Sequence, residues 1–518
     1  MRQMKKTLCF ILCVLMGVMC CAGAYADEWS ASFILAMVTD TATELNPLKA
    51  TNRDVISVDM LIYESLIELD DTGKPAANLA TSWTAEDNGW TWYFTIREGV
   101  KFHNGNELTA ADVVASIEYV RTNKCGAWSQ VVNAFVDSIE ALDTYSICVT
   151  ARTPSYALLY AMTCPIVPAS EVSSSQPSGS GPYSILTASM GSYIRLNSNQ
   201  DWWKRTPTLQ TIEVRNFSNF DSALGQLDIR AVDAVATRST SAARFRGVEG
   251  YYVTDYVTRQ LECLVPNLSS DSPLSVLNVR QAVMEALDKQ TLISNVYLSM
   301  ATQADACVPP GDWLYEPLAE VYDSDQNGAR TYLAAAGWTD VDGDGIMEKQ
   351  TATGSYDQLD IKIITYEEPD YPSRQDAATL IAEQLGEVGF NVTIEVMEQS
   401  ELLEAVKDGD YDLALVGYYL GMAPDYTFML GTDGSSNLNG YSSTQMDAAL
   451  NDALTSVAES DFESAIDNIQ MIVAQDLPVL SLYFRGGSLV SYLDMSSLDS
   501  LSELNTYNGL EYWEGVAG

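Results

Sequence analysis

Three short apolar segments alternate with helical patterns between residues 359 and 418, and no other feature limits the fold as strongly. The segments have the length and β-branched content of strands. Strands that alternate with helices lie parallel in one sheet, with helices on both faces. We therefore predict an α/β fold. The expected strands are 359–366, 391–396 and 411–418, and the expected helices are 377–388 and 401–407.

The carboxyl ends of these strands are the first place to look for a ligand site, because ligands of open α/β sheets bind beyond those ends. Tyr366 ends the first expected strand, and Tyr418 and Tyr419 end the third. We predict that these three tyrosines contribute to ligand binding.

The first half of the chain carries weaker signs of the same architecture. Residues 211–217 and 231–236 are typical of strands, and 222–227 of a helix between them. Residues 33–38 predict a buried strand that leads into a polar loop beginning with Thr39 and Asp40, where a ligand could meet exposed backbone. We therefore expect two α/β lobes that pack closely, since no Pro-rich linker separates them.

The N-terminus has the pattern of a cleavable secretory signal. Arg2, Lys5 and Lys6 precede an apolar stretch at 8–19, and Ala24-Tyr25-Ala26 matches an A-x-A cleavage site. The stretch is shorter than the roughly 20 residues that a membrane-spanning helix needs. We expect export to the periplasm or the extracellular space after cleavage of residues 1–26.

A lipid anchor on Cys20 or Cys21 is the competing interpretation. The position before the modified cysteine would then hold Met19 or Cys20, where a small residue is expected. We therefore favour cleavage over lipidation.

Acidic residues greatly outnumber basic ones, at 70 against 28, which gives a formal net charge of −42. A surface of this charge repels phosphate backbones and anionic lipid. We expect no nucleic-acid partner and no membrane-surface partner.

Cysteine and histidine usage argues against metal and nucleophile chemistry. Five cysteines follow the signal, with no zinc spacing: Cys125, Cys148, Cys164, Cys263 and Cys307. Cys148 and Cys164 could form a disulfide or could lie buried as small apolar residues. With His103 as the single histidine and no nucleophile elbow, we predict that the protein is not an enzyme and uses no cofactor. A carboxylate-based hydrolase remains the least favoured alternative.

Short motifs follow one recurring order along the chain. They are Gly73-Lys74-Pro75, Leu79-Ala80-Thr81-Ser82-Trp83, Phe102-His103-Asn104-Gly105, Ser180-Gly181-Pro182-Tyr183, Trp202-Trp203, Val279-Arg280-Gln281-Ala282 and Ala336-Gly337-Trp338. In these motifs the chain resembles the family 5 extracellular solute-binding proteins, the peptide and nickel group of ABC-importer binding proteins. The resemblance covers nearly the whole mature chain.

The resemblance implies a two-lobed periplasmic-binding-protein-like fold of type II, with an extra subdomain in the first lobe. The implied parts are a first lobe at 27–266 with the subdomain at about 60–185, a second lobe at 267–485, and a C-terminal return to the first lobe at 486–518. Segments near 263–268 and 482–487 would form the hinge. Among the motif residues, Trp83 and Trp90 are expected to fill the core.

The function implied is capture of a small ligand between the lobes, most readily a peptide-like one, and delivery to an ABC permease and ATPase complex. A monomer is expected. An oligosaccharide or a cationic metabolite as ligand, or a sensor role for the same fold, stays open as an alternative.

The loop after the strand at 411–418 departs from the pattern of peptide-binding relatives. Those relatives carry there an aspartate that pairs with the amino terminus of the peptide, and here Leu420 or Gly421 occupies that position. An amino terminus buried without a carboxylate would lose a hydrogen bond worth about 1.5 to 3 kcal/mol. Ordinary dipeptides are therefore expected to bind poorly.

Without that aspartate, the loop and its surroundings still offer tyrosines and a methionine to a ligand. Aromatic faces bind cations, sugars and apolar side chains alike. The expected ligand-binding residues are Thr39, Asp40, Tyr366, Tyr418, Tyr419, Met422 and, on the second crossing segment, Tyr483.

One segment resembles the first half of a calcium-binding loop. Asp340, Asp342 and Asp344 occupy positions 1, 3 and 5, and Gly345 occupies position 6. Position 12 is Thr351, not a bidentate glutamate, and Asp-Gly repeats are also ordinary turn formers. We regard these aspartates as a weak calcium candidate and expect no tight binding.

Overall fold

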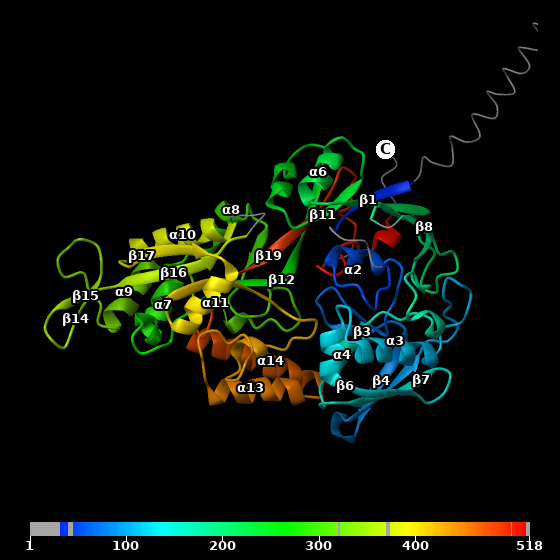
Figure 1. Ribbon diagram of the computed structural model, residues 1–518, viewed down its shortest axis with the longest axis horizontal. Coiled ribbons are helices and arrows are strands. Elements are labelled where there is room, and N and C mark those ends of the chain that lie inside the picture. Colours follow the sequence, from blue (N-terminus) through cyan, green and yellow to red (C-terminus); the bar gives the residue numbers. More distant parts are fainter. Residues whose placement is uncertain are drawn as a thin grey trace, which may run out of the picture.

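One large mixed sheet runs through both halves of the molecule (Figure 1). The computed structural model describes residues 32–39, 45–189, 191–319, 322–368, 373–498 and 500–513. In spatial order, the strands of the sheet are β17 (Asn391–Met397), β16 (Asp360–Tyr366), β18 (Leu413–Tyr419), β12 (Tyr252–Pro266), β19 (Leu480–Ser491), β11 (Ala234–Thr237), β1 (Ser32–Val38), β10 (Thr211–Phe217), β9 (Tyr193–Ser198) and β8 (Tyr183–Ser189). A short strand, β13 (Ala301–Gln303), pairs with β19 beside this path.

The parallel βαβ arrangement predicted for the second half is confirmed. β16 pairs in parallel with both β17 and β18, so that Ile363 lies between Ile394 and Leu413. Helix α10 (Ser373–Glu387) connects β16 to β17, and α11 (Gln399–Asp408) connects β17 to β18. Parallel strands need such crossover helices, and the apolar faces of these helices cover the sheet.

A second βαβ unit lies in the first half, also as predicted. β1 pairs in parallel with β10 on one side and with β11 on the other. Helix α6 (Phe220–Asp228) lies between β10 and β11, and its Leu224 and Leu227 are fully buried against Val235. These two units give the molecule two lobes around one sheet.

Strands β12 and β19 cross between the lobes, and Figure 1 shows them at the centre of the molecule. The two strands are antiparallel to each other, and β12 also pairs antiparallel with β18. The pairing register of β12 with β19 shifts between Val257 and Leu261, which marks a bulge in β12.

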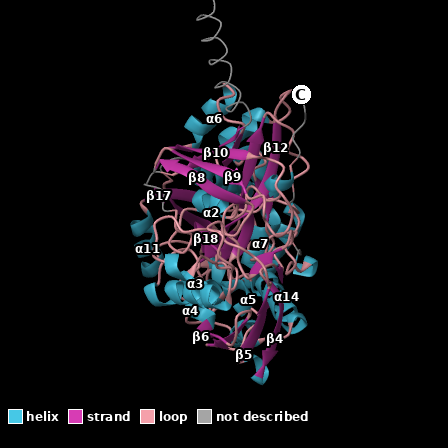
Figure 2. Ribbon diagram, turned by 90° about the vertical axis from the view of Figure 1, so that its right-hand side faces the viewer, coloured by secondary structure: helices cyan, strands magenta, loops and turns pink. Residues whose placement is uncertain are grey.

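A separate subdomain built around a small sheet occupies the N-terminal part of the chain. Its four strands, in spatial order, are β4 (Ala80–Glu86), β5 (Thr91–Ile96), β7 (Ser146–Ala151) and β6 (Val136–Ala141). Helices α3 (Ala110–Asn123) and α4 (Ser129–Phe135) pack on this sheet, next to a hairpin of β2 (Ile67–Leu69) and β3 (Pro75–Ala77). Figure 2 shows this sheet at the opposite end of the molecule from β8, β9 and β10.

Trp90 does not fill the core, contrary to the prediction. The side chain is 50% exposed, because β5 begins one residue later and places Trp92, Phe94 and Ile96 inward.

Helices cover the sheet in the second half. Its apolar core includes Leu264, Ala282, Leu385 and Leu415, which are fully buried. The remaining helices and the outer hairpin are α7 (Leu277–Ala286), α8 (Lys289–Val296), α9 (Gln326–Ala335), α12 (Thr427–Leu430), α13 (Thr444–Thr455), α14 (Glu459–Asp476), β14 (Glu348–Gln350) and β15 (Tyr356–Gln358). Two short helices of the first half complete the fold: α2 (Arg53–Asp59) and α5 (Leu158–Ala161).

Cys125, Cys148, Cys164, Cys263 and Cys307 are free thiols. Cys148 and Cys164 are buried and unbridged, so the apolar alternative for this pair holds. Burial raises the pKa of both thiols, which keeps them protonated and unreactive at neutral pH.

Candidate functional site between the lobes

Tyr419 lies where three distant parts of the chain meet. It ends β18, is 44% exposed, and donates a hydrogen bond of 3.3 Å from its hydroxyl to Glu503. The guanidinium of Arg53, at the start of α2, lies 4.0 Å from the centroid of its ring. A cation over an aromatic face is attractive, so this tyrosine joins the second half of the chain to the first.

Glu503 is the centre of this junction, and no pattern in the sequence predicted its role. The residue is only 3% exposed and forms a salt bridge with Arg53. Its other carboxylate oxygen accepts a hydrogen bond of 2.9 Å from the backbone N–H of Arg259. A buried carboxylate needs such donors, and here they come from α2, the bulge of β12 and the end of β18.

Met422 and Arg259 form the next part of the site. Nη1 of Arg259 donates a hydrogen bond of 2.6 Å to the carbonyl of Gly421 and lies 3.7 Å from the sulfur of Met422. A positive charge therefore sits at the loop position where an acid was expected by resemblance and where the sequence has Leu420 and Gly421. The sequence did not reveal this, since Arg259 is 162 residues away from Gly421.

Tyr418 and Tyr483 lie inside the second half, away from this junction. Tyr418 is 7% exposed, and its hydroxyl donates to the carbonyl of Ser436 at 3.0 Å. Tyr483 is fully buried and donates to the hydroxyl of Tyr297 at 3.1 Å. The alternation of side chains along a strand explains Tyr418, because its neighbour Tyr419 points to the opposite face. Both buried tyrosines therefore fit packing better than ligand contact.

Tyr366 belongs to a buried ionic network. Its ring lies 4.1 Å from the guanidinium carbon of Arg374, which forms a two-pronged ion pair with the fully buried Glu262. Arg485 pairs with the same carboxylate at 2.7 Å, and Glu368 bridges both arginines. Two arginines and two glutamates balance in charge, as a buried network requires.

Position 417, beside this network, has room only for glycine. A Cβ atom at this position would lie 2.8 Å from Oε1 of Glu262 and 3.0 Å from Nη2 of Arg374. The strand that carries Tyr418 and Tyr419 is thereby held against the crossing strands.

The loop after β1, which was predicted to contact a ligand, lies only partly within the described residues. Thr39 follows β1, is buried, and is held by Asn216 and by the carbonyl of Phe217. Asp40 lies outside the described residues.

A second set of contacts joins the subdomain to the far lobe. The backbone N–H of Trp313 donates to the carbonyl of Thr72 at 3.0 Å, and its indole N–H donates to the hydroxyl of Tyr160 at 3.1 Å. Tyr156 donates its hydroxyl to Glu459 at the start of α14. Within the described part of the chain, the two halves therefore meet at this contact as well as at the junction of Tyr419 with Glu503.

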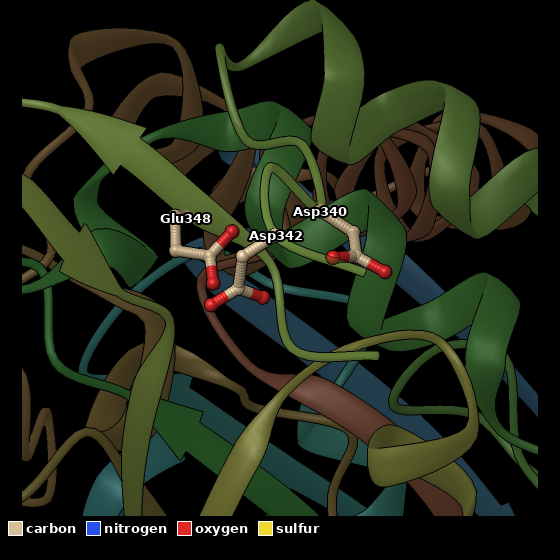
Figure 3. Close-up of side chains that lie close together, drawn as sticks. All are labelled: Asp340, Asp342 and Glu348. Carbon is tan, nitrogen blue, oxygen red and sulfur yellow. The ribbon is translucent and has the colours of Figure 1, made fainter. Parts of the chain in front are cut away.

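The acidic loop, which holds Asp340, Asp342 and Asp344, lies in the second half next to strand β14. Figure 3 shows the carboxylate of Glu348 turned toward that of Asp342. Asp340, Asp342 and Glu348 can bring one oxygen each within 4.8 Å of one another, and Glu348 was not among the predicted residues. Asp344 instead accepts a hydrogen bond from the N–H of Ile346. Asp340 accepts from two backbone N–H groups of the loop, as in an ordinary Asp-Gly turn.

The molecule has two α/β lobes that are joined by crossing strands, and side chains of both lobes meet between them. This arrangement is that of a binding protein of the periplasmic type. A family model of the bacterial extracellular solute-binding proteins, family 5, matches residues 74–440. The chain belongs to this family, and the resemblance noted from its motifs is confirmed.

Curated relatives extend the match over most of the chain. The oligopeptide-binding protein AppA of Bacillus subtilis (strain 168) is 25% identical over 496 residues, which cover 91% of this chain and 89% of that protein. The nickel-binding periplasmic protein of Escherichia coli (strain K12) is 24% identical over 389 residues, which cover 71% and 72%.

Solved structures confirm the two-lobed fold. A nickel ABC transporter protein from Bacillus halodurans superposes with a TM-score of 0.78 at 21% identity, covering 91% of this chain and 95% of that one. The unliganded open form of the murein tripeptide-binding protein MppA gives a TM-score of 0.77 at 16% identity, covering 92% and 95%. Among the described residues, no helix is both long and apolar enough to cross a bilayer.

Proposed function

We propose that this solute-binding protein captures a peptide or a peptide-like molecule between its lobes and delivers it to an ABC permease and ATPase complex. The first lobe would comprise residues 27–266 and 486–518, and the second lobe 267–485. The observation that supports the proposal is the junction of Tyr419, Glu503 and Arg53, because in it side chains from distant parts of the chain contact one another.

Two further observations favour a peptide over a nickel complex. The relative that matches over 91% of the chain is named an oligopeptide-binding protein. The single histidine, His103, lies in the subdomain, where Nε2 contacts the carbonyl of Gly181 at 3.0 Å. Burial lowers the pKa of His103, which agrees with a neutral structural residue.

Co-purified ligand provides the direct test. Molecules extracted from the protein purified in native buffer are identified by mass spectrometry, and synthetic versions are added back to the ligand-free protein. We expect peptides, and a smaller radius of gyration in X-ray scattering at saturation, because a ligand that contacts both lobes stabilises the closed form. Extracts that hold only sugars or metal chelates, or a radius that stays constant at saturation, would contradict the proposal.

We also propose export through residues 1–26, a monomeric state and no catalytic turnover. Amino-terminal sequencing of the exported protein should begin at Asp27, and light scattering should give the mass of one mature chain.

A further inference from the structure

Three aromatic rings meet at the contact between the subdomain and the second half of the chain. Tyr156 comes from the subdomain, Trp313 from the loop after β13, and Phe462 from α14. The ring centroid of Tyr156 lies 5.3 Å from that of Phe462 and 5.9 Å from that of Trp313, and the last two rings lie 6.2 Å apart. Aromatic rings at such distances attract one another beyond the effect of their burial.

The centre of this contact is as apolar as the interior of a domain. Tyr156 and Phe462 are both buried. They belong to one continuous apolar cluster with Leu158 of the subdomain and Ile466 of α14, and Trp313 packs against this cluster. Separation of the two halves here would expose the three rings to water, which is unfavourable.

Polar contacts across the same boundary surround the rings. The backbone N–H of Tyr156 donates to the carbonyl of Ser456 at 2.7 Å, and the hydroxyl of Tyr156 donates to Glu459 at 3.1 Å. Lys74, in the turn between β2 and β3, forms an ion pair with the same glutamate, and its ammonium lies 5.1 Å from the ring centroid of Trp313. An apolar centre with a polar rim is the arrangement of a protein–protein interface.

The backbone of the subdomain also comes close to the loop between α13 and α14. A Cβ atom at Gly89 would lie 2.3 Å from Cγ2 of Val457. Figure 1 shows α13 and α14, in orange, beside the helices and strands of the subdomain, in cyan and blue. The fit at this position therefore leaves no room for a side chain.

Helix α14 is anchored in the second half at its other end. The carbonyl of Asp476 accepts a hydrogen bond of 2.8 Å from Nη2 of Arg280 on α7, and the carbonyl of Ala474 accepts one of 3.1 Å from the hydroxyl of Tyr322. The helix thus connects the core of the second half to the subdomain. If the lobes open about β12 and β19, as the proposed function requires, the contact of Phe462 with Tyr156 has to break.

We propose that the contact of Tyr156, Trp313 and Phe462 is a latch, which closes the lobes in a fraction of the ligand-free molecules. The inference rests on the proposed closure around a ligand and assigns part of the closing free energy to the chain itself. Because the affinity for a ligand rises in proportion to the fraction of molecules that can bind it, the latch increases the affinity for any ligand held between the lobes. The ligand then closes the remaining molecules.

Hydrogen exchange of the ligand-free mature protein measures the opening of the latch. The backbone N–H groups of Tyr156 and Trp313 donate to the carbonyls of Ser456 and Thr72 across the boundary, so they exchange when the contact opens. We expect fragments that contain these two residues to exchange more slowly than an unfolded peptide and faster than fragments of β12. This intermediate rate would mean that the latch opens without unfolding of the crossing strands.

A methyl group placed in the contact should open the latch. Gly89→Ala drives a Cβ against Val457, and we expect exchange at Tyr156 and Trp313 to accelerate by about tenfold. The radius of gyration of the ligand-free variant in X-ray scattering should also increase. Gly99→Ala is the matched control, because both glycines have a positive φ, +87° and +77°, but a Cβ at position 99 would have no described atom within 4 Å. It should keep the exchange rates and the radius of the parent protein.

Circular dichroism checks the fold of each variant. If Gly89→Ala does not fold, Tyr156→Phe takes its place. This variant keeps the ring and loses only the hydrogen bond to Glu459, so exchange at Trp313 should accelerate by a smaller factor, about threefold.

Three results would overturn the latch. Exchange at Tyr156 and Trp313 as slow as in β12 would show a permanent interface, and exchange as fast as in an unfolded peptide would show that the contact is open in the ligand-free protein. Equal exchange rates and radii in Gly89→Ala and Gly99→Ala would show that the contact does not control closure. All these measurements are made without ligand, so a failure of the latch leaves the peptide function standing, and only the co-purification experiment decides that function.

Discussion

The hydroxyl of Tyr419 donates a hydrogen bond to the carboxylate of Glu503, although 84 residues separate the two side chains along the chain. Tyr419 ends a strand of the second half, and Glu503 belongs to the C-terminal segment that returns to the first half. Arg53 contacts both, by a salt bridge to Glu503 and by lying over the ring of Tyr419. A ligand that enters between the lobes would meet this group.

Replacement of Tyr419 should therefore affect binding more than stability. We expect Tyr419→Ala to weaken binding of a co-purified ligand by about 5- to 30-fold, since an aromatic platform is worth roughly 1 to 2 kcal/mol. Because the side chain is 44% exposed, the loss in unfolding free energy should stay near 1 kcal/mol. Calorimetry and thermal unfolding measure the two effects. Tyr356→Ala, at an exposed tyrosine of the outer hairpin, is the control and should change neither. Unchanged affinity in Tyr419→Ala would remove this residue from the site.

Gly417, on strand β18, should tolerate no side chain, in contrast to Gly421 in the loop that follows. Gly417→Ala would bring a Cβ within 2.8 Å of the buried Glu262, and we expect a loss of about 1 to 3 kcal/mol in the unfolding free energy. Gly421→Ala is the matched control, because the nearest atom would be 3.7 Å away. Urea unfolding measures the unfolding free energy of both variants. Equal stability of the two variants would show that the ionic network can shift to make room.

Glu64 should make stability depend on pH. This buried carboxyl accepts hydrogen bonds from Ser180, Trp202 and Trp203, and burial raises its pKa from 4.5 to about 7. Between pH 4.5 and 7 the unfolded chain ionises Glu64 while the folded protein keeps it protonated. The stabilisation is therefore complete below about pH 4.5 and is lost as the pH rises to about 7, by up to roughly 3 kcal/mol.

Glu64→Gln removes this titration. The stability of the variant relative to the parent protein should rise by about 2 to 3 kcal/mol between pH 5 and pH 8, as measured by urea unfolding at each pH. Glu249→Gln, at an exposed site, should show no such trend. A constant difference between Glu64→Gln and the parent over this range would mean that Glu64 is ionised in the folded protein.

The acidic loop should not hold calcium tightly. Glu348 adds a carboxylate beside Asp340 and Asp342, but position 12 of the loop is Thr351, which cannot supply the bidentate contact. Calorimetry at micromolar calcium should show no binding heat. A one-site isotherm that disappears in Glu348→Gln would prove this expectation wrong and would show that Glu348 replaces the missing ligand.

The position of the strands and helices could be predicted because their signal is local. Apolar residues at 359–366 and 411–418, separated by helical patterns, predicted parallel strands that the structure confirms as β16 and β18. The same local reasoning predicted Tyr366, Tyr418 and Tyr419 at the carboxyl ends of strands, and these residues lie there in β16 and β18. A strand pattern alone does not tell which face of the sheet another element covers, so it could not predict that Tyr418 is buried while Tyr419 is exposed.

The sequence by itself determined the α/β class, the family and the loop that carries Tyr419 and Met422. Only the tertiary structure decided which charges meet that loop. Arg53 lies 450 residues from Glu503, and Arg259 lies 244 residues from it. No periodicity or motif links residues so far apart, because their contacts arise only when the C-terminal segment folds back against α2 and β12.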